Sequence, residues 1–231
     1  MLYKKLRWLA AIEQFRSATI ECDFVSQICH EAALDFQIYY EKFCSERGID
    51  ISELNNDHRE HLKQIYNIED TEEVPNPLGD VTAEEETTAL SVFKGTKTEE
   101  KSESVEDKEI HETFSKLFKK IAMVIHPDKL SGDLSAAERY RLTKMFKDVI
   151  LGLEEKRYFV LLDAATEFKI RIPDNYALQI KWMRRQIKVI AAEAQHERKT
   201  YNYMFAESET DEERDMLVKK FLFQLFKLQV P

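Results

Sequence analysis

Apolar residues recur at helical spacing in the second half of the chain. From Phe114 to Ile125 they follow steps of three and four residues, which place them on one stripe of an amphipathic helix. The stripe consists of Phe114, Leu117, Phe118, Ile121, Val124 and Ile125. Pro127 cannot continue a helix and disfavours the α conformation of the residue before it. We therefore predict that the helix ends at an exposed bend made by His126, Pro127 and Asp128.

A second amphipathic helix is predicted after a short polar loop. Ser135 and Glu138 have the spacing of a capping box, which indicates a helix that starts at Ser135. The apolar residues behind it repeat the helical spacing. They are Leu142, Met145, Phe146, Val149, Ile150 and Leu153. Two helices joined by a short loop bury such stripes against each other, so we predict an antiparallel hairpin with the His-Pro-Asp bend at its tip.

The first 68 residues show the same periodicity and predict a small helical unit. Two helices are expected before Arg47, the second about 27 residues long. Gly48 is typical of a helix stop, and Ser52 is the expected cap of a short helix that reaches about Tyr66. No motif in this unit indicates a function.

The C-terminal residues 173–231 predict long helices. One is expected from Asn175 to about Ala206, and packing against the N-terminal helices is its main interpretation. A coiled-coil dimer and an RNA-binding face stay open for it. Thr210 and Glu213 form a further capping box before a helix that is apolar around much of its circumference. Such a helix must be buried. We expect it to cover the hairpin of residues 114–155, and insertion into a partner or client protein is the alternative.

The middle of the chain is strongly acidic. Residues 69–112 contain 15 Asp or Glu and 4 Lys, so their net charge is −11 against −9 for the whole chain. Few apolar residues and several Pro, Ser and Thr favour a flexible, self-repelling segment. We therefore divide the chain into a helical unit at 1–68, an acidic linker at 69–108, a hairpin domain at 109–172 and long helices at 173–231.

Composition agrees with an all-α fold and narrows the class of protein. Five Gly and five Pro in 231 residues are few for the tight turns of an all-β fold. The net negative charge argues against general nucleic-acid binding, because phosphate contacts need a positive surface. Three cysteines without CxxC spacing fit a reducing compartment, and no apolar run reaches the roughly 20 residues of a membrane span. We expect a cytoplasmic protein.

The segment FKKIAMVIHPDKL, followed by FKDVILGL, resembles the second helix, His-Pro-Asp loop and third helix of J-domains. J-domains are the co-chaperone modules of DnaK-type (heat-shock protein 70) ATPases. The resemblance covers about residues 109–172. Its continuation, EKRYFVLLDAATEFKIRIP, is more similar to J-like proteins of phages and large DNA viruses than to cellular ones. We therefore expect a viral or phage origin, with activity in the host cytoplasm.

The resemblance implies a partner and a set of binding residues. The tripeptide of His126, Pro127 and Asp128 matches the signature that triggers ATP hydrolysis in the partner. The basic residues beside it match the face that docks on the partner's acidic surface. These basic residues are Lys116, Lys119, Lys120 and Lys129. The expected function is recruitment and stimulation of a DnaK-type chaperone for an unknown client protein, without a cofactor, a metal or catalytic chemistry of the chain's own.

The chain also departs from the J-domain pattern. No first-helix pattern precedes Glu109, the loop after Asp128 is longer than in compact J-domains, and neither a Gly/Phe-rich stretch nor a CxxCxGxG zinc module is present. An alternative function is therefore a structural or assembly protein that uses the hairpin for binding without stimulating an ATPase.

The sequence also contains residues that suit catalysis or metal binding. Catalysis with His126 as base and Asp128 as orienting group lacks an accompanying nucleophile or oxyanion-stabilising loop. Asp57, His58 and His61 have a spacing that suits a metal ion, but histidines on a polar helix are more often solvated. Neither chemistry is part of the predicted function.

Overall fold

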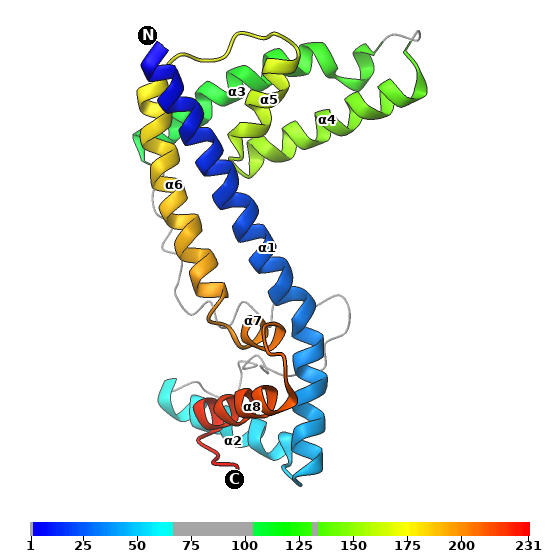
Figure 1. Ribbon diagram of the computed structural model, residues 1–231, viewed down its shortest axis with the longest axis vertical. Helices are drawn as coiled ribbons and strands as arrows, with labels where there is room; N and C mark the ends of the chain where they lie inside the picture. Colours follow the sequence, from blue (N-terminus) through cyan, green and yellow to red (C-terminus); the bar gives the residue numbers. More distant parts are fainter. Residues whose placement is uncertain (1, 67–103, 131–133) are drawn as a thin grey trace. The chain divides into compact units, whose positions relative to one another are not determined.

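A computed structural model describes residues 2–66, 104–130 and 134–231, and these residues form helices without β-strands. The all-α prediction is confirmed for this part of the chain. The helices of Figure 1 are α1 (Leu2–Glu46), α2 (Ile51–Tyr66), α3 (Val105–Ile125), α4 (Ala136–Glu154), α5 (Tyr158–Glu167), α6 (Tyr176–Glu197), α7 (Tyr201–Ala206) and α8 (Asp211–Phe226). Among these helices, none has both the length and the apolar character needed to cross a membrane.

The chain divides into two compact units. The first comprises Met1–Asp23 with Lys101–Ala194, and the second comprises Phe24–Glu100 with Gln195–Pro231. The predicted boundaries after residues 68, 108 and 172 stay a prediction. Most of the predicted acidic linker, residues 69–103, lies outside the described residues.

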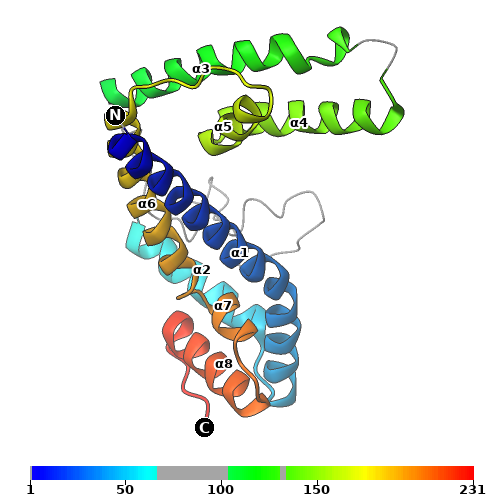
Figure 2. The same cartoon turned by 45° about the horizontal axis from the view of Figure 1, so that its top comes forward.

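In the first unit, α3 and α4 run in opposite directions and α5 packs against both (Figure 2). The N-terminal part of α1 and helix α6 complete the same apolar core. Phe15 of α1 meets Trp182 of α6 edge to face, with ring centroids 5.5 Å apart. Phe114 of α3 stacks on Tyr158 of α5 at 4.1 Å. The prediction that the C-terminal long helix packs against N-terminal residues is therefore confirmed for α6. The single helix predicted from Asn175 to about Ala206 is wrong, because α6 ends at Glu197 and Thr200 caps a separate helix, α7.

Capping side chains set the starts of several helices. The predicted capping boxes of Ser135 with Glu138 and of Thr210 with Glu213 are both present. A third box begins α3, where Ser104 caps the helix and the side chain of Asp107 returns the hydrogen bond. This box starts α3 at residue 105, nine residues before the predicted apolar stripe and four before the predicted start of the hairpin domain at residue 109. Aspartate in place of the usual Glu or Gln at the third helical position concealed it.

The prediction of two helices before Arg47 is wrong, because α1 is one helix of 45 residues. Residues 2–46 contain neither Gly nor Pro, so nothing in the backbone forces a break. Gly48 is confirmed as the stop, with a φ of +65° that suits the left-handed end of a helix. The cap of α2 is Asp50 and not Ser52. Its carboxylate accepts hydrogen bonds from the backbone N–H groups of Ser52 and Glu53, at 2.8 and 3.2 Å.

Helix α8 does not cover the α3–α4 pair, so that prediction is wrong. Its buried residues Leu217, Val218 and Leu222 belong to the core of the second unit, together with Phe36 and Tyr40 of α1. In the first unit, side chains of α1, α5 and α6 bury the apolar faces of α3 and α4. Helix α1 carries apolar residues along its whole length. Its N-terminal part therefore packs in the core of the first unit, and its C-terminal part packs against α8 in the core of the second unit.

Candidate partner-binding site

The His-Pro-Asp bend lies at the end of α3, as the sequence predicts. His126 caps the helix in an extended conformation, with φ −61° and ψ 130°, as expected for a residue before proline. Pro127, Asp128 and Lys129 then form a single 3₁₀ turn. Pro127 occupies the first position of this turn, where its missing N–H costs no hydrogen bond. The local sequence therefore determines both the end of α3 and the shape of the turn.

The His126 side chain orders this turn. Its Nδ1 accepts a hydrogen bond from the Asp128 backbone N–H at 3.2 Å, and the Asp128 carboxylate lies 3.7 Å from the same nitrogen. Because Nδ1 accepts, the proton of the neutral imidazole is on Nε2. The ring also meets Phe146 of α4 edge to face, with centroids 5.0 Å apart. His126 is thus fixed both to its own turn and to the neighbouring helix.

The exposure of the tripeptide differs along its length. The Asp128 side chain is 88% exposed, whereas that of His126 is 39% exposed because one ring edge packs on Phe146. Lys129 is exposed and Pro127 is half-buried. The prediction of an exposed bend is therefore confirmed for the side chains of Asp128 and Lys129, whereas the His126 imidazole is partly covered.

A basic surface adjoins the turn on α3. Lys116, Lys119 and Lys120 are all exposed, and residues 113–130 carry four Lys against one Asp. Lys116 forms an ion pair with Glu112 at 2.7 Å, which lowers the pKa of that carboxyl through a hydrogen bond and the lysine charge. Among the described residues, no carboxylate pairs with Lys119 or Lys120. The positive charge of these two side chains is available to a binding partner.

The opposite face of α3 anchors this surface to the core. Ile110, Phe114, Leu117, Ile121 and Ile125 are buried. Phe118 of the predicted stripe stacks beside Phe146 of α4 at 6.3 Å. Because the anchoring residues follow the helical period, they hold the lysines on the solvent side of the helix.

Val124 is the exception to the predicted stripe. It is 48% exposed, and its neighbour Met123 is exposed as well. Ile110, one turn before the predicted start, takes part in the core in its place. The stripe is therefore longer and narrower than the sequence pattern indicated.

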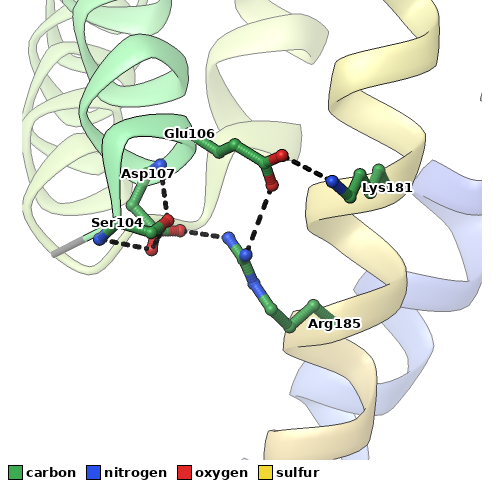
Figure 3. A network of polar contacts seen from close by, with 5 residues as sticks. All are labelled: Ser104, Glu106, Asp107, Lys181 and Arg185. Carbon is green, nitrogen blue, oxygen red and sulfur yellow. Dashed lines mark hydrogen bonds and ion pairs between the residues drawn. The ribbon is translucent and has the colours of Figure 1, made fainter. Parts of the chain in front are cut away.

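Polar contacts tie the start of α3 to α6 (Figure 3). Glu106 pairs with Lys181 and Arg185, and Asp107 pairs with Arg185. Burial raises the pKa of the Asp107 carboxyl, but the Ser104 hydrogen bond and the Arg185 charge outweigh it, so the pKa lies below its ordinary value. The sequence analysis missed this network. The pattern of Ser104 with Asp107 three residues later signals only the cap of α3, not its contact with α6.

The histidines considered as metal ligands, His58 and His61, belong to α2. Among the described residues, no group of three or more His, Cys, Asp or Glu side chains lies close enough to hold a metal ion. The His58 ring meets Phe226 edge to face at 5.6 Å, while the side chain of His61 lies outside the described residues.

Comparisons with protein-family models, curated proteins and solved structures give no match to this chain.

Proposed function

We propose that this protein is a J-domain-like co-chaperone that recruits a DnaK-type chaperone and stimulates its ATP hydrolysis. The observation that carries the proposal is the His126–Asp128 turn at the end of a helix that also bears the exposed Lys119 and Lys120. The resemblance of this segment to J-domains supplies the identity of the partner. The lysines lie near the C-terminal end of α3 and the turn follows directly after it, so a partner is able to contact both together.

The electrostatics support docking on an acidic partner. The protein carries a net charge of −9, yet residues 113–130 sum to +3. A local positive surface on an acidic protein orients an encounter with a negatively charged partner and disfavours encounters through other faces. The interaction is expected to weaken as salt rises, because exposed charges are screened over about 8 Å at physiological ionic strength.

The geometry of His126 supports a role for the tripeptide as a preformed unit. Its imidazole accepts a hydrogen bond from the Asp128 backbone N–H, so the backbone of the turn is fixed at Asp128 before any partner binds. A preordered turn loses less conformational entropy on binding than a flexible one. In this role the chain needs no nucleophile or metal of its own, since the chemistry takes place in the ATPase.

The test is steady-state ATP hydrolysis by a DnaK-type chaperone with the full chain added. His126→Gln should abolish stimulation and leave the helical circular dichroism spectrum unchanged, because the side chain is 39% exposed and lies outside the buried core. His30→Gln is the matched control, since it makes the same change at an exposed position of α1.

The outcomes separate the two functions under consideration. Stimulation that is lost in the His126 variant and kept in the His30 variant supports the co-chaperone. Binding of the chaperone without stimulation by the wild-type chain supports the structural or assembly protein instead. Equal stimulation by the wild type and both variants would show that the tripeptide is not needed for stimulation.

A further inference from the structure

The first turns of α1 have an apolar face that the core of the first unit does not cover. From Trp8 to Phe15 the core-facing side chains are buried. The side chains of Tyr3, Leu6 and Leu9 are 65%, 54% and 44% exposed. At about 100° per residue these three lie within an arc of roughly 120°, on the side of the helix opposite the buried residues. We call these three side chains the apolar strip, and all of them belong to the first unit.

Basic side chains border the apolar strip on both edges. Lys5 lies about 40° beyond Leu9 around the helix, and Arg7 lies about 40° beyond Tyr3. Both basic side chains are exposed, and so is that of Lys4. In the described part of the chain, no carboxylate pairs with any of the three. Their positive charges are therefore available to a binding partner.

The contact between Arg7 and Tyr3 fixes one edge of the apolar strip. The Arg7 Nη2 donates a hydrogen bond to the Tyr3 hydroxyl at 2.8 Å, and the guanidinium carbon lies 4.4 Å from the centre of the tyrosine ring. The tyrosine ring is therefore part of the apolar strip, while its hydroxyl lies at the basic edge. Aromatic rings with one apolar and one polar end are enriched at the boundary between lipid and water.

The charge of this helix segment is opposite to that of the chain. Residues 3–12 contain three basic residues and no Asp or Glu, so their net charge is +3. The whole chain carries −9, so the other residues sum to −12. An anionic surface attracts this segment and repels the rest of the protein, so electrostatics select this face of α1 for the contact.

An anionic lipid bilayer suits both the apolar and the basic part of this face. When a helix lies in the bilayer interface, its apolar side chains enter the acyl boundary, while long Lys and Arg side chains reach the lipid phosphates. A soluble polyanion would bind the charges but leave the exposed leucines in water. The combination of strip and flanking charges therefore favours a membrane over a soluble acidic partner.

We propose that residues 3–10 of α1 adsorb to an anionic lipid membrane, with the apolar strip at the acyl boundary and Lys5 and Arg7 at the lipid headgroups. The strip contributes three large apolar side chains, so the adsorption is reversible. It shares no residue with the turn of residues 126–128. The proposal therefore does not depend on the co-chaperone function.

Co-sedimentation of the full chain with lipid vesicles tests the electrostatic part. The wild type should bind vesicles of phosphatidylcholine with phosphatidylserine in preference to vesicles of phosphatidylcholine alone, and this binding should weaken as salt rises. Lys5→Gln combined with Arg7→Gln should lower the partition coefficient roughly 25-fold, because each basic residue near an anionic surface contributes about fivefold. Lys144→Gln combined with Lys147→Gln is the control, since it removes the same charge from exposed positions of α4.

A second pair of substitutions tests the apolar strip. Leu6→Gln combined with Leu9→Gln should lower the partition coefficient by at least about tenfold and leave the circular dichroism spectrum unchanged, because both side chains are exposed in the folded protein. Tyr140→Gln combined with Leu151→Gln is the control, since it removes two exposed apolar side chains from α4.

Several results would overturn the proposal. They are an absence of wild-type binding to phosphatidylserine vesicles at low salt, equal binding to the two kinds of vesicle, and an unchanged partition coefficient in either α1 variant. Polyglutamate serves as the soluble probe. If it binds the wild type and the Leu6/Leu9 variant equally while the vesicles bind neither, the face is a site for an acidic protein instead.

Discussion

Single side chains decide how the proposed docking site is held in place. His126 receives the Asp128 N–H, Phe146 supports the imidazole ring, and Arg185 holds Asp107 at the far end of α3. None of these contacts is deeply buried, so each contributes modestly to the free energy of unfolding, at about 1 kcal/mol. Their role is to restrict α3 and its terminal turn to one arrangement.

The lysines of α3 give a prediction about association. Lys119→Glu combined with Lys120→Glu should lower the association rate with a DnaK-type chaperone by roughly tenfold and remove most of its salt dependence, because both charges are exposed and close to the turn. Binding kinetics at two salt concentrations measure this. Lys188→Glu combined with Lys220→Glu changes the net charge equally and should have little effect. A salt-independent wild-type affinity would contradict a docking role for the lysines.

Asp107 gives a prediction about acid stability. Its pKa in the folded chain lies below its ordinary value of 3.8, because the Ser104 hydrogen bond and the Arg185 charge outweigh the opposing effect of burial. A lowered folded pKa stabilises the fold above the unfolded pKa, and this stabilisation is lost as the pH falls from about 4 through the folded pKa.

Urea unfolding at several pH values measures this contribution. Asp107→Asn should cost about 1 kcal/mol at pH 7 and lose less stability than the wild type on acidification. Glu109→Gln, at an exposed position of the same helix, is the control. Equal pH profiles for the wild type and the Asp107 variant would show that the network does not stabilise the fold.

Two glycines are required by the helices of this protein, one at a close helix–helix contact and one at a helix end. Helices α4 and α5 meet at Gly152, where an added Cβ would lie 3.0 Å from the Val160 Cβ and 3.3 Å from the Arg157 carbonyl oxygen. Glycine inside a helix costs about 1 kcal/mol relative to alanine, so its presence here reflects the close contact of the two helices. Gly48 has a different reason, since no atom lies near it and its φ is +65°.

These two glycines should respond differently to substitution. Gly152→Ala should lower the free energy of unfolding by about 1 kcal/mol, because overpacking exceeds the gain in helix propensity, and Gly152→Leu should cost more. At Gly48, Ala and Leu should each cost about 1 kcal/mol, since the cost comes from the backbone alone. Thermal or urea unfolding measures all four variants. An equal cost for Ala and Leu at Gly152 would contradict the steric explanation.

At the scale of the whole molecule, α1 serves two cores. Trp8 donates a hydrogen bond from Nε1 to the Gln179 Oε1 at 2.7 Å and is almost fully buried in the first unit. Further along the same helix, Phe36 packs against Phe205 and Phe221 in the second unit. Substitutions on α1 therefore affect one unit or the other according to their position.

Trp8→Ala tests this division. It should destabilise the first unit by about 3–5 kcal/mol, because it removes a large buried ring and leaves the Gln179 carbonyl oxygen without its donor. Hydrogen exchange should accelerate at Ile121 of α3 and stay unchanged at Val218 of α8. Gln14→Ala, at an exposed position of α1, should change neither. Equal acceleration at Ile121 and Val218 would show that the two units unfold together.

The sequence by itself determined the local features of this protein. Periodicity and composition predicted helices, two capping boxes and the stop at Gly48, because each depends on residues within a few positions of one another. Pro127 likewise determined the end of α3 and the His-Pro-Asp turn. The basic face of α3 followed from the same helical period.

Only the tertiary structure decided which apolar faces meet. The sequence shows that α8 must be buried, but several faces of similar apolar character were available to it, and periodicity does not choose among them. The structure places α8 against Phe36 and Tyr40, and gives α3 and α4 the side chains of α1, α5 and α6. The network of Asp107 with Arg185 joins residues 78 positions apart, so no local pattern could predict it. Long-range contacts depend on the packing of the whole chain, whereas helix ends and turns depend on the conformations of neighbouring residues.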